Sequence, residues 1–285
     1  VVALVSKVSC VDLRIEKFRD KMENFLTKMT APVEDEKIKI GINGLDNVLR
    51  GGVARGEFLC MIAPPGRGKS MFLINAAYGA VKNRKKVLFI TLELSEEQIG
   101  GRFIRRIECK DRRTIINERD MVLSHLKFFI ENSEDIFIFY HKPHELTVAG
   151  IRSLIEKINR QYGTIDVLII DYFDRLKLEH KDDRIGLGRL VDGLRDLAYE
   201  KDLAVITATQ ANRASLSAIV VTEEHVADSF KKVESADIVL SFNIDKEKGK
   251  NMGRYMVLKN REYGNVGAQI PVLVDFDKSE IKDAT

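Results

Sequence analysis

The sequence predicts an α/β fold, in which a mostly parallel, twisted sheet is covered by helices on both faces. Short apolar stretches alternate with longer amphipathic ones, and stretches such as Val167 to Ile170 are apolar throughout. Strands without a polar face are buried on both sides, as they are in a parallel sheet between two helical layers. A second observation is the glycine-rich turn Pro64 to Gly68, which lies between an apolar stretch and a helical one. A strand, a tight turn and a helix in this order are typical of α/β domains that bind phosphate groups.

The spacing of apolar residues predicts the order of the elements. Strands are expected at residues 58–62, 86–92, 136–140, 167–171 and 204–208. Helices are expected after the glycine-rich turn and at residues 96–107, 148–160 and 187–199, with Thr147 as the N-cap of the second of these ranges. The C-terminal part has strand-like stretches at 238–242, 255–259 and 272–276 with short links. We therefore expect it to extend the sheet with some antiparallel pairing.

A separate segment precedes this domain. Apolar residues recur at alternating spacings of three and four between Val11 and Met29, which predicts an amphipathic helix. Ala31-Pro32 ends this helix, and a charged stretch follows. We divide the chain into residues 1–36, with the N-terminal helix, and residues 37–285, the α/β domain. The helix either folds back on its own domain or docks on a neighbouring subunit, and its spacing does not decide between them.

The composition indicates a soluble globular protein. Of its 285 residues, 45% are hydrophobic and 31% are charged, and the net charge of +3 is too small to indicate nucleic-acid binding by itself. Any basic surface must therefore be local. The three cysteines, Cys10, Cys60 and Cys109, have no metal-ligand spacing, which favours a reducing, cytoplasmic setting. No apolar run approaches the roughly 20 residues of a membrane span, so no membrane partner is expected.

The stretch Ala63 to Ser70 predicts a phosphate-binding loop. It matches the pattern G-x-x-x-x-G-K-[ST] except for Ala63 at the first position. Backbone N–H groups of such a turn point into one concavity, and the following helix adds the positive end of its dipole. Lys69 would reach the outer phosphates, and Ser70 would bind the Mg²⁺ ion that bridges them. The expected nucleotide-binding residues are Pro65, Gly66, Arg67, Gly68, Lys69, Ser70 and Met71. The alternative is a turn that merely joins a strand to a helix, and the Gly-Lys-Ser triplet argues against it.

Three polar residues follow predicted strands at their carboxyl ends, where reactive groups collect in parallel sheets. Glu93 follows the strand at 86–92, Asp171 ends the strand at 167–171, and Gln210 lies shortly after the strand at 204–208. Beside the phosphate loop they suit hydrolysis: a carboxylate to accept a proton from water, a carboxylate for Mg²⁺ and an amide to sense the γ-phosphate. Each could instead be a solvated strand end, but together they predict a hydrolysis site.

These residues resemble a known family, the motor domain of the DnaB-type hexameric replicative helicases, within the RecA-like ATPases. The resemblance runs from about Gly41 to Phe276. It rests on the following motifs in this order: the phosphate loop beginning with Ala63, Thr91 to Gln98 (TLELSEEQ), Ile169 to Tyr172 (IIDY), Gln210 with Asn212-Arg213, and Lys259-Asn260-Arg261. The TLELSEEQ stretch and the final Lys-x-Arg are the more specific ones. The resemblance implies a RecA-like P-loop ATPase fold.

The resemblance also implies the roles of individual residues. Lys69 and Ser70 would bind phosphates and magnesium, Glu93 would activate water, Asp171 would organise magnesium, and Gln210 would couple nucleotide state to DNA. Lys259 and Arg261 would reach the ATP of a neighbouring subunit and stabilise its transition state. The implied cofactors are ATP or another NTP and Mg²⁺. The implied assembly is a hexameric ring with ATP sites between subunits, to which the helix at 11–29 contributes by docking on an adjacent subunit.

Single-stranded DNA is the expected substrate, and a primase or helicase loader is a further possible partner through regions outside this chain. A motor that encircles a strand binds its backbone through basic residues on loops, without reading bases. Two segments after the catalytic strands qualify, and the candidate DNA-binding residues are Lys177, Lys181, Arg184, Arg213, Lys231 and Lys232. Acidic residues lie between them, so a plain solvated loop is the alternative for each.

The leading hypothesis is therefore an ATP-driven replicative DNA helicase motor domain. One alternative is a RecA- or KaiC-like ATPase of recombination or signalling, which would use the same fold. Another is a non-motor, ATP-dependent loader or scaffold, in which nucleotide only holds subunits together. Glu93 favours turnover over static binding, because a carboxylate in that place acts on the attacking water.

Overall fold

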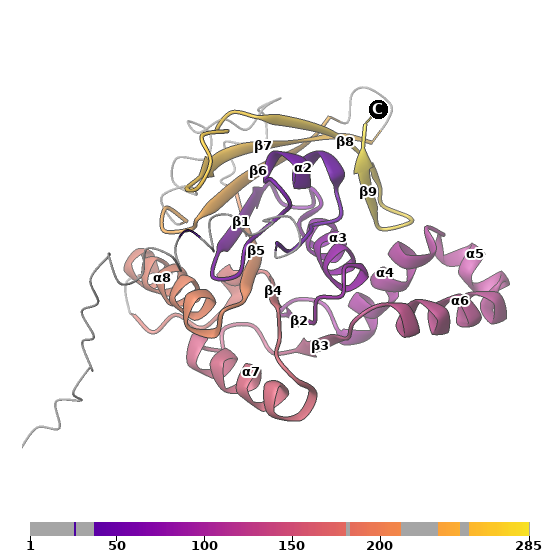
Figure 1. Cartoon of the computed structure of the whole chain (residues 1–285), viewed down its shortest axis with the longest axis horizontal. Helices are drawn as coiled ribbons and strands as arrows, with labels where there is room; N and C mark the ends of the chain where they lie inside the picture. Colours follow the sequence, from indigo (N-terminus) through magenta and orange to yellow (C-terminus); the bar gives the residue numbers. More distant parts are fainter. Residues whose placement is uncertain (1–25, 27–36, 181–182, 212–232, 246–250, 285) are drawn as a thin grey trace, which may run out of the picture. The chain divides into compact units, whose positions relative to one another are not determined.

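The computed structural model describes Leu26 and residues 37–180, 183–211, 233–245 and 251–284 (Figure 1). The chain divides into two compact units, Val1–Asp35 and Glu36–Thr285, and every described residue except Leu26 belongs to the second. Leu26 is helical, and the rest of the N-terminal helix expected between Val11 and Met29 lies outside the described residues. None of the described helices is both long enough and apolar enough to cross a membrane.

The described strands form one sheet of nine in the order β3-β2-β4-β5-β1-β6-β7-β8-β9. Their bounds are β1 Phe58–Ala63, β2 Val87–Thr91, β3 Ile136–Tyr140, β4 Val167–Asp171, β5 Ala204–Gln210, β6 Ile238–Asp245, β7 Met252–Asn260, β8 Gln269–Asp275 and β9 Glu280–Asp283. All pairs from β3 to β6 are parallel, and β6 to β9 pair antiparallel. The predicted α/β fold with a mostly parallel sheet and an antiparallel extension is confirmed.

Helices follow most of the parallel strands. Their bounds are α2 Asn43–Val48, α3 Lys69–Lys82, α4 Glu96–Glu108, α5 Arg112–Asn117, α6 Arg119–Asn132, α7 Val148–Tyr162 and α8 Asp183–Lys201, with a 3₁₀ turn at Phe173–Arg175. The predicted cap is present, since Thr147 Oγ1 accepts a hydrogen bond from the N–H of Gly150, and Ser95 and Gln98 form a capping box at the start of α4. Helix α8 begins four residues before the predicted start at Leu187.

The apolar strands bury alternate side chains in two separate cores. On β1, Leu59 and Met61 pack in the core that contains α3 and α4, while Phe58, Cys60 and Ile62 pack in the core that contains α7 and α8. Successive side chains of a strand point to opposite faces, so a fully apolar strand needs a helical layer on each side. Figure 1 shows α3 and α4 on one side of the sheet and α7 and α8 on the other.

Four elements were not predicted from the sequence: α2, α5, α6 and β9. Helix α6 packs on α4 and buries only Val122. Several of its apolar side chains are exposed: Met121, Leu123, Phe128 and Ile130. In Figure 1, α5 and α6 extend beyond α4, away from the central strands. These helices therefore present an apolar surface that the described residues do not cover.

Candidate nucleotide-binding site

The register of the parallel strands brings the predicted site residues to one edge of the sheet. Ala63, the last residue of β1, pairs with Gln210, the last residue of β5. Thr91, at the end of β2, pairs with Asp171, at the end of β4, and Glu93 follows two residues after Thr91. Because β2, β4, β5 and β1 are consecutive in the sheet, these residues and the loop after β1 lie along the same carboxyl edge.

The turn between β1 and α3 needs glycine at two positions. Gly66 has a φ of 66° and Gly68 a φ of 92°, in the left-handed region that residues with a side chain rarely adopt. A Cβ atom at Gly68 would also lie 3.2 Å from the ring of Phe242 on β6. Both positions are thus restricted by backbone conformation, and Gly68 also by packing.

The loop is also tied to the neighbouring strand. Arg67 Nη1 donates a hydrogen bond of 2.9 Å to the carbonyl oxygen of Ile244 on β6, and Arg67 N donates to Pro64 O at 3.3 Å. The side chain of Arg67 is therefore engaged in holding the loop against the sheet. This contact leaves its guanidinium less free to meet a nucleotide than the sequence pattern alone indicates.

The start of α3 is open to an anion. No side chain caps this helix at Gly68, and its first turn contains no acidic residue. The N–H groups of a helix's first turn have no partner within the helix, and the helix dipole makes this end positive. The 14 residues of α3 give it a full dipole at the place where Lys69 and Ser70 begin the helix. These features suit the phosphates of a nucleotide.

Asp171 is a buried carboxylate without a full hydrogen bond. It is 1% exposed, and neither of its carboxylate oxygens has a hydrogen-bond partner among the described residues. Burial raises the pKa of Asp171 to about 6, and the nearby Ser70 hydroxyl and the charge of Arg102 act against this rise. Ser70 is thus close enough to favour the charged form, although it is not aligned for a full hydrogen bond. Free carboxylate oxygens beside a hydroxyl fit Mg²⁺, which protein carboxylates and phosphates hold together.

Lys69 lies in the field of three carboxylates. Burial lowers the pKa of its ammonium group, and the charges of Asp171, Glu93 and Asp174 oppose this effect. Its Nζ lies 5.4 Å from the centre of the Tyr172 ring, on the segment that follows β4. The lysine is therefore directed toward the end of β4, where outer phosphates bound by the loop would need a cation.

Glu93 has an ionic partner that the sequence did not reveal. Arg175 Nη2 lies 3.7 Å from Glu93 Oε1, and Arg175 Nε donates to the hydroxyl of Tyr172 at 2.9 Å. The Glu93 side chain is about half exposed, so water can reach it. Arg175 therefore orients a solvent-accessible carboxylate beside the phosphate loop, which is what a base for the attacking water requires.

Two further residues near the site, Arg102 and Asp174, were not among the predicted site residues. The charge of Arg102 on α4 acts on both Asp171 and Glu93, and burial lowers the pKa of its guanidinium. Asp174 accepts hydrogen bonds from Thr209 Oγ1 at 2.8 and 3.0 Å, which joins the segment after β4 to the end of β5. The sequence signal for Arg102 is its position one helical turn after the TLELSEEQ stretch. That position alone does not show that its side chain points toward Asp171.

Lys259 and Arg261 lie at the opposite edge of the sheet. Ile238 pairs with Leu59 near the start of β1 and with Asn260 on β7, so the residues around Asn260 lie beside the start of β1. The phosphate loop follows the end of β1, roughly 17–20 Å away at about 3.3 Å per residue. Neither cation can reach the loop of its own chain.

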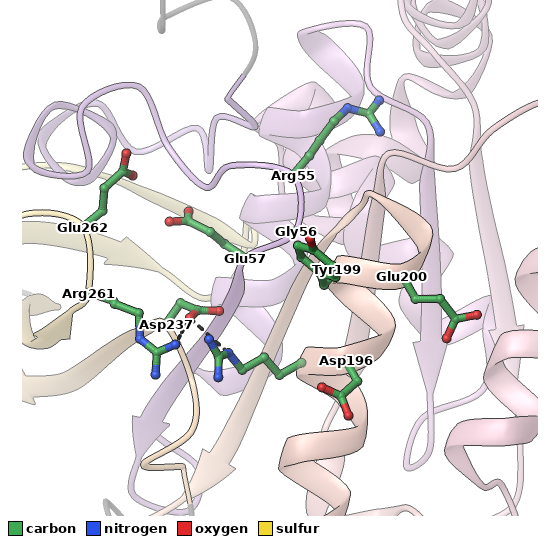
Figure 2. A pocket seen from close by; sticks show the side chains of 10 residues that line it. Arg55, Gly56, Glu57, Asp196, Tyr199, Glu200, Asp237, Arg261 and Glu262 are labelled. Carbon is green, nitrogen blue, oxygen red and sulfur yellow. Dashed lines mark hydrogen bonds and ion pairs between the residues drawn. The ribbon is translucent and has the colours of Figure 1, made fainter. Parts of the chain in front are cut away.

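Arg261 is fixed by a buried carboxylate in a cleft of about 780 Å³ (Figure 2). Asp237 Oδ1 lies 3.3 Å from Arg261 Nη1 and accepts a hydrogen bond from Arg195 Nε at 3.2 Å, while Oδ2 accepts from Phe58 N at 3.1 Å. Lys259 Nζ donates to the carbonyl oxygen of Glu234. Burial lowers the pKa of Lys259, and the charge of Asp237 opposes this. The two predicted trans-acting cations are thus held in place by the same region of the chain.

The predicted DNA-binding residues are only partly described. Lys177 is exposed after the 3₁₀ turn and lines a cleft of about 340 Å³ with Arg152 and Arg189. Arg184 lies in the first turn of α8. The other predicted residues, Lys181, Arg213, Lys231 and Lys232, lie outside the described residues.

The sheet order, the glycine turn and the strand-end carboxylates define a RecA-like P-loop ATPase domain. The comparison with protein families identifies its kind. Residues 37–270 match the family model described as DnaB-like helicase C terminal domain, which covers most of the chain. The chain therefore belongs to this family.

Similar curated proteins carry helicase names. The chain is 25% identical over 210 residues to the probable replicative DNA helicase of Trieres chinensis, covering 70% of this chain and 46% of that protein. It is 27% identical over 202 residues to the replicative DNA helicase DnaB of Rickettsia felis, covering 62% of this chain and 38% of that protein. The aligned part thus spans less than half the length of these relatives.

Solved structures share the fold. A structure whose title names an ATPase domain has a TM-score of 0.82 at 18% identity and covers 94% of this chain and 99% of its own. The structure titled "The Structure Of A DnaB-Like Replicative Helicase And Its Interactions With Primase" has a TM-score of 0.79 at 19% identity, covering 95% of this chain and 67% of its own. The RadB recombinase has a TM-score of 0.60 at 17% identity, covering 87% of this chain and 100% of its own. At these identities the likeness shows the shared fold.

Proposed function

We propose that this chain is the motor domain of a replicative DNA helicase, which hydrolyses ATP or another NTP to translocate on single-stranded DNA and unwind duplex. The observation that carries the proposal is Asp171, a fully buried carboxylate with no full hydrogen bond, beside a phosphate loop. Such a group costs stability unless a ligand satisfies it. The family match over residues 37–270 supports the coupling of this site to DNA unwinding.

In the proposed mechanism each strand-end residue has one task. The N–H groups from Gly66 to Met71 and the Lys69 ammonium bind the phosphates, Pro65 lines the loop without donating an N–H, and Ser70 and Asp171 hold Mg²⁺. When bound, Mg²⁺ neutralises the charge that develops on the phosphates. Glu93, oriented by Arg175, accepts a proton from the attacking water.

Gln210 has the position for sensing the nucleotide. It is exposed at the end of β5 and pairs with Ala63, where the phosphate loop begins. A change in the loop upon hydrolysis would therefore reach Gln210 directly. The segment after Gln210 contains the candidate DNA contacts Arg213, Lys231 and Lys232, and the segment after Asp171 contains Lys177, Lys181 and Arg184. We propose that these residues bind the DNA backbone without sequence preference.

We infer that the chain acts as a homo-oligomeric ring, a hexamer, with nucleotide sites between subunits. Two features support this: Arg261 and Lys259 lie too far from the loop of their own chain, and α6 exposes four apolar side chains. The helix expected at 11–29 would add a docking contact to an adjacent subunit. A primase contact is part of the printed title of one similar structure. For this chain, a primase or helicase loader is a proposed partner, and the cytoplasm, or that of a host cell, is the proposed location.

The alternatives predict different activities. A RecA- or KaiC-like ATPase would hydrolyse ATP without unwinding duplex, and a loader or scaffold would bind nucleotide with little turnover. The family match and the accessible Glu93 favour the helicase. The decisive measurement is whether single-stranded DNA raises the ATPase rate and whether a forked duplex is unwound in the same preparation. ATPase activity without unwinding by the assembled protein would favour the RecA-like alternative.

Two variants test the site itself. Lys69→Ala removes the phosphate-binding cation, so nucleotide affinity measured by calorimetry should fall at least about tenfold. Glu93→Gln keeps the shape and the hydrogen-bonding capacity toward Arg175 but cannot accept a proton, so affinity should persist while turnover falls at least about a hundredfold. Nucleotide affinity of Lys69→Ala equal to that of the unmodified protein would contradict the phosphate-loop assignment.

A further inference from the structure

The turn that carries Arg261 is built around a buried side chain. Asn260, at the end of β7, accepts hydrogen bonds through its Oδ1 from the N–H groups of Glu262 and Tyr263, at 3.1 and 3.2 Å. Asn260 is buried, and its backbone pairs with Ile238 on β6. The backbone of the turn is therefore held from the inside by the strand that precedes it.

Lys37 holds the other side of the same turn. Its Nζ lies 3.3 Å from Glu262 Oε2 and donates to the hydroxyl of Tyr263 at 3.1 Å and to the carbonyl oxygen of Leu49 at 3.3 Å. Only 4% of the Lys37 side chain is exposed. A buried ammonium group persists only with such acceptors around it, and two of the three belong to the residues that follow Arg261.

The anchoring of Lys37 extends to its surroundings. The next residue, Ile38, forms an antiparallel bridge with Val53, with hydrogen bonds of 2.7 and 3.0 Å. The Tyr263 ring lies 4.5 Å from Lys37 Nζ and 4.5 Å from the guanidinium carbon of Arg50. Cations near an aromatic face are attracted to it, so Tyr263 is held by two of them. The backbone next to Lys37 is therefore fixed, and so is the position from which its ammonium group contacts the turn.

Neighbouring side chains of the turn point in different directions. Figure 2 shows the guanidinium of Arg261 directed toward Asp237 and the carboxylate of Glu262 directed away from it. Asp237 thus holds the side chain of Arg261, while Lys37 holds the two residues after it. Arg261 and the two residues after it are therefore held by different parts of the chain.

We propose that Lys37 is a positioning residue for Arg261, which fixes the turn so that the guanidinium meets the nucleotide bound by another copy of the chain. The proposal rests on the proposed function in one respect, that Arg261 acts in trans. Lys37 touches no nucleotide in this proposal and acts only through Glu262 and Tyr263. Displacing a catalytic group by about 1 Å can cost on the order of a hundredfold in rate.

The test compares Lys37→Met with Lys39→Met. Methionine keeps much of the apolar stem and removes the ammonium group, and Lys39 is an exposed lysine two residues away. We expect Lys37→Met to lower the DNA-stimulated kcat for ATP by roughly 10- to 100-fold. The KM for ATP should change little, because the loop of the same chain is intact. Lys39→Met should behave as the unmodified protein, and Lys37→Arg should restore most of the rate.

Mixed assemblies show where the defect acts. When Lys37→Met subunits are mixed with unmodified ones, ATPase activity should fall by more than the fraction of Lys37→Met subunits. The reason is that each such subunit impairs hydrolysis at the nucleotide site of a neighbour. Tyr263→Ala, which removes one of the three acceptors of Lys37 and leaves the lysine in place, should have a trans effect in the same direction. This variant decides the question if thermal melting shows that Lys37→Met does not fold.

Arg261→Ala measured in parallel separates this inference from the proposed function. One outcome would contradict the role of Lys37 alone. In it, Arg261→Ala lowers the ATPase activity of neighbouring subunits, while folded Lys37→Met and Tyr263→Ala have the same activity as Lys39→Met. Lys37 then has no positioning role. If Arg261→Ala itself acts only in proportion to its fraction, the trans assignment fails and this inference fails with it. A drop in kcat for Lys37→Met that Lys37→Arg reverses, together with the trans effect, supports the proposal.

Discussion

Asp171 places a carboxylate at the end of β4 where water does not reach it, and burial raises its pKa from 3.8 to about 6. The folded chain without nucleotide therefore binds a proton at this residue more tightly than the unfolded chain. Between about pH 4 and pH 6, rising pH then lowers the stability of the nucleotide-free protein. At neutral pH the charged group opposes folding, and a bound cation would remove that penalty.

The first residue-scale prediction concerns Asp171→Asn. With a chelator and no nucleotide, the variant should be more stable than the unmodified protein at pH 7.5, by up to about 3 kcal/mol, because a shift of two pKa units is worth about 1.4 kcal/mol per unit. The gain should shrink as the pH falls from about 6 toward about 4, and should disappear below about pH 3, where the carboxyl group is protonated in both states. Urea unfolding at several pH values measures this difference in unfolding free energy between the two proteins. A variant that is less stable than the unmodified protein at pH 7.5 would contradict the burial argument.

The same variant should lose the stabilisation that Mg²⁺ and ATP give to the unmodified protein. A ligand that binds only the folded state raises the unfolding free energy in proportion to the logarithm of its concentration. Thermal melting with and without Mg²⁺–ATP compares the two proteins.

Some site residues are predictable from the sequence and others are not, for a physical reason. Lys69 and Ser70 belong to a local motif, and Asp171 and Gln210 end recognisable strands, so their shared edge follows from the fold class. Arg102 and Arg175 approach Glu93 and Asp171 from a helix face and a loop. Such contacts depend on side-chain reach in three dimensions, and no spacing in the sequence encodes them.

At the scale of elements, α6 shows why a real helix can lack a helical pattern. An amphipathic period is visible only when one face of a helix is buried and the other is polar. Helix α6 buries Val122 alone and exposes apolar residues around its surface, so no single apolar stripe stands out. Strand β9 has four residues and α2 has six, which is too short for either period to be recognised. The predicted ends of β1 to β5 lie within two residues of the observed ones, whereas β6, β7 and β8 each differ by three residues at one end.

The exposed apolar residues of α6 predict a contact with another molecule of this chain. Phe128→Glu combined with Ile130→Glu should weaken self-association at least about tenfold, because burial of a large apolar side chain contributes about 1.5–3 kcal/mol. The stability of the single chain should change by less than about 0.5 kcal/mol per substitution, since both side chains point into solvent. Sedimentation velocity over a range of protein concentrations measures the association.

Lys127→Glu is the matched control, because it changes the charge of an exposed position next to the two apolar ones. If the double variant associates as strongly as Lys127→Glu, the α6 surface takes no part in assembly.

At the scale of the whole domain, the sheet separates the two halves of the proposed catalytic machinery. The phosphate loop, Asp171 and Glu93 lie at the carboxyl edge of the parallel strands, and Arg261 lies at the amino edge. One copy therefore cannot bring Arg261 to its own nucleotide. A copy placed head to tail could do so, and repeated contacts of this kind close into a ring when the rotation between copies permits it. The parallel fold was predictable from apolar strands, but the strand order that creates this separation was not, because it depends on long-range pairing.

The last prediction concerns Arg261, at the place where charge develops during phosphoryl transfer. A guanidinium supplied by a neighbour can be worth roughly 10³ to 10⁵ in rate, so its loss should be severe. Arg261→Ala subunits should bind ATP almost normally, because the loop on the far edge is unchanged. Mixed with unmodified subunits, they should nevertheless reduce hydrolysis more than in proportion to their fraction, since each leaves a neighbouring site without its cation. Lys69→Ala subunits in the same experiment should silence their own sites while still supplying Arg261 to a neighbour. A strictly proportional fall in activity for Arg261→Ala, with subunit exchange confirmed by labelled subunits, would leave Arg261 as the ionic partner of Asp237 and nothing more.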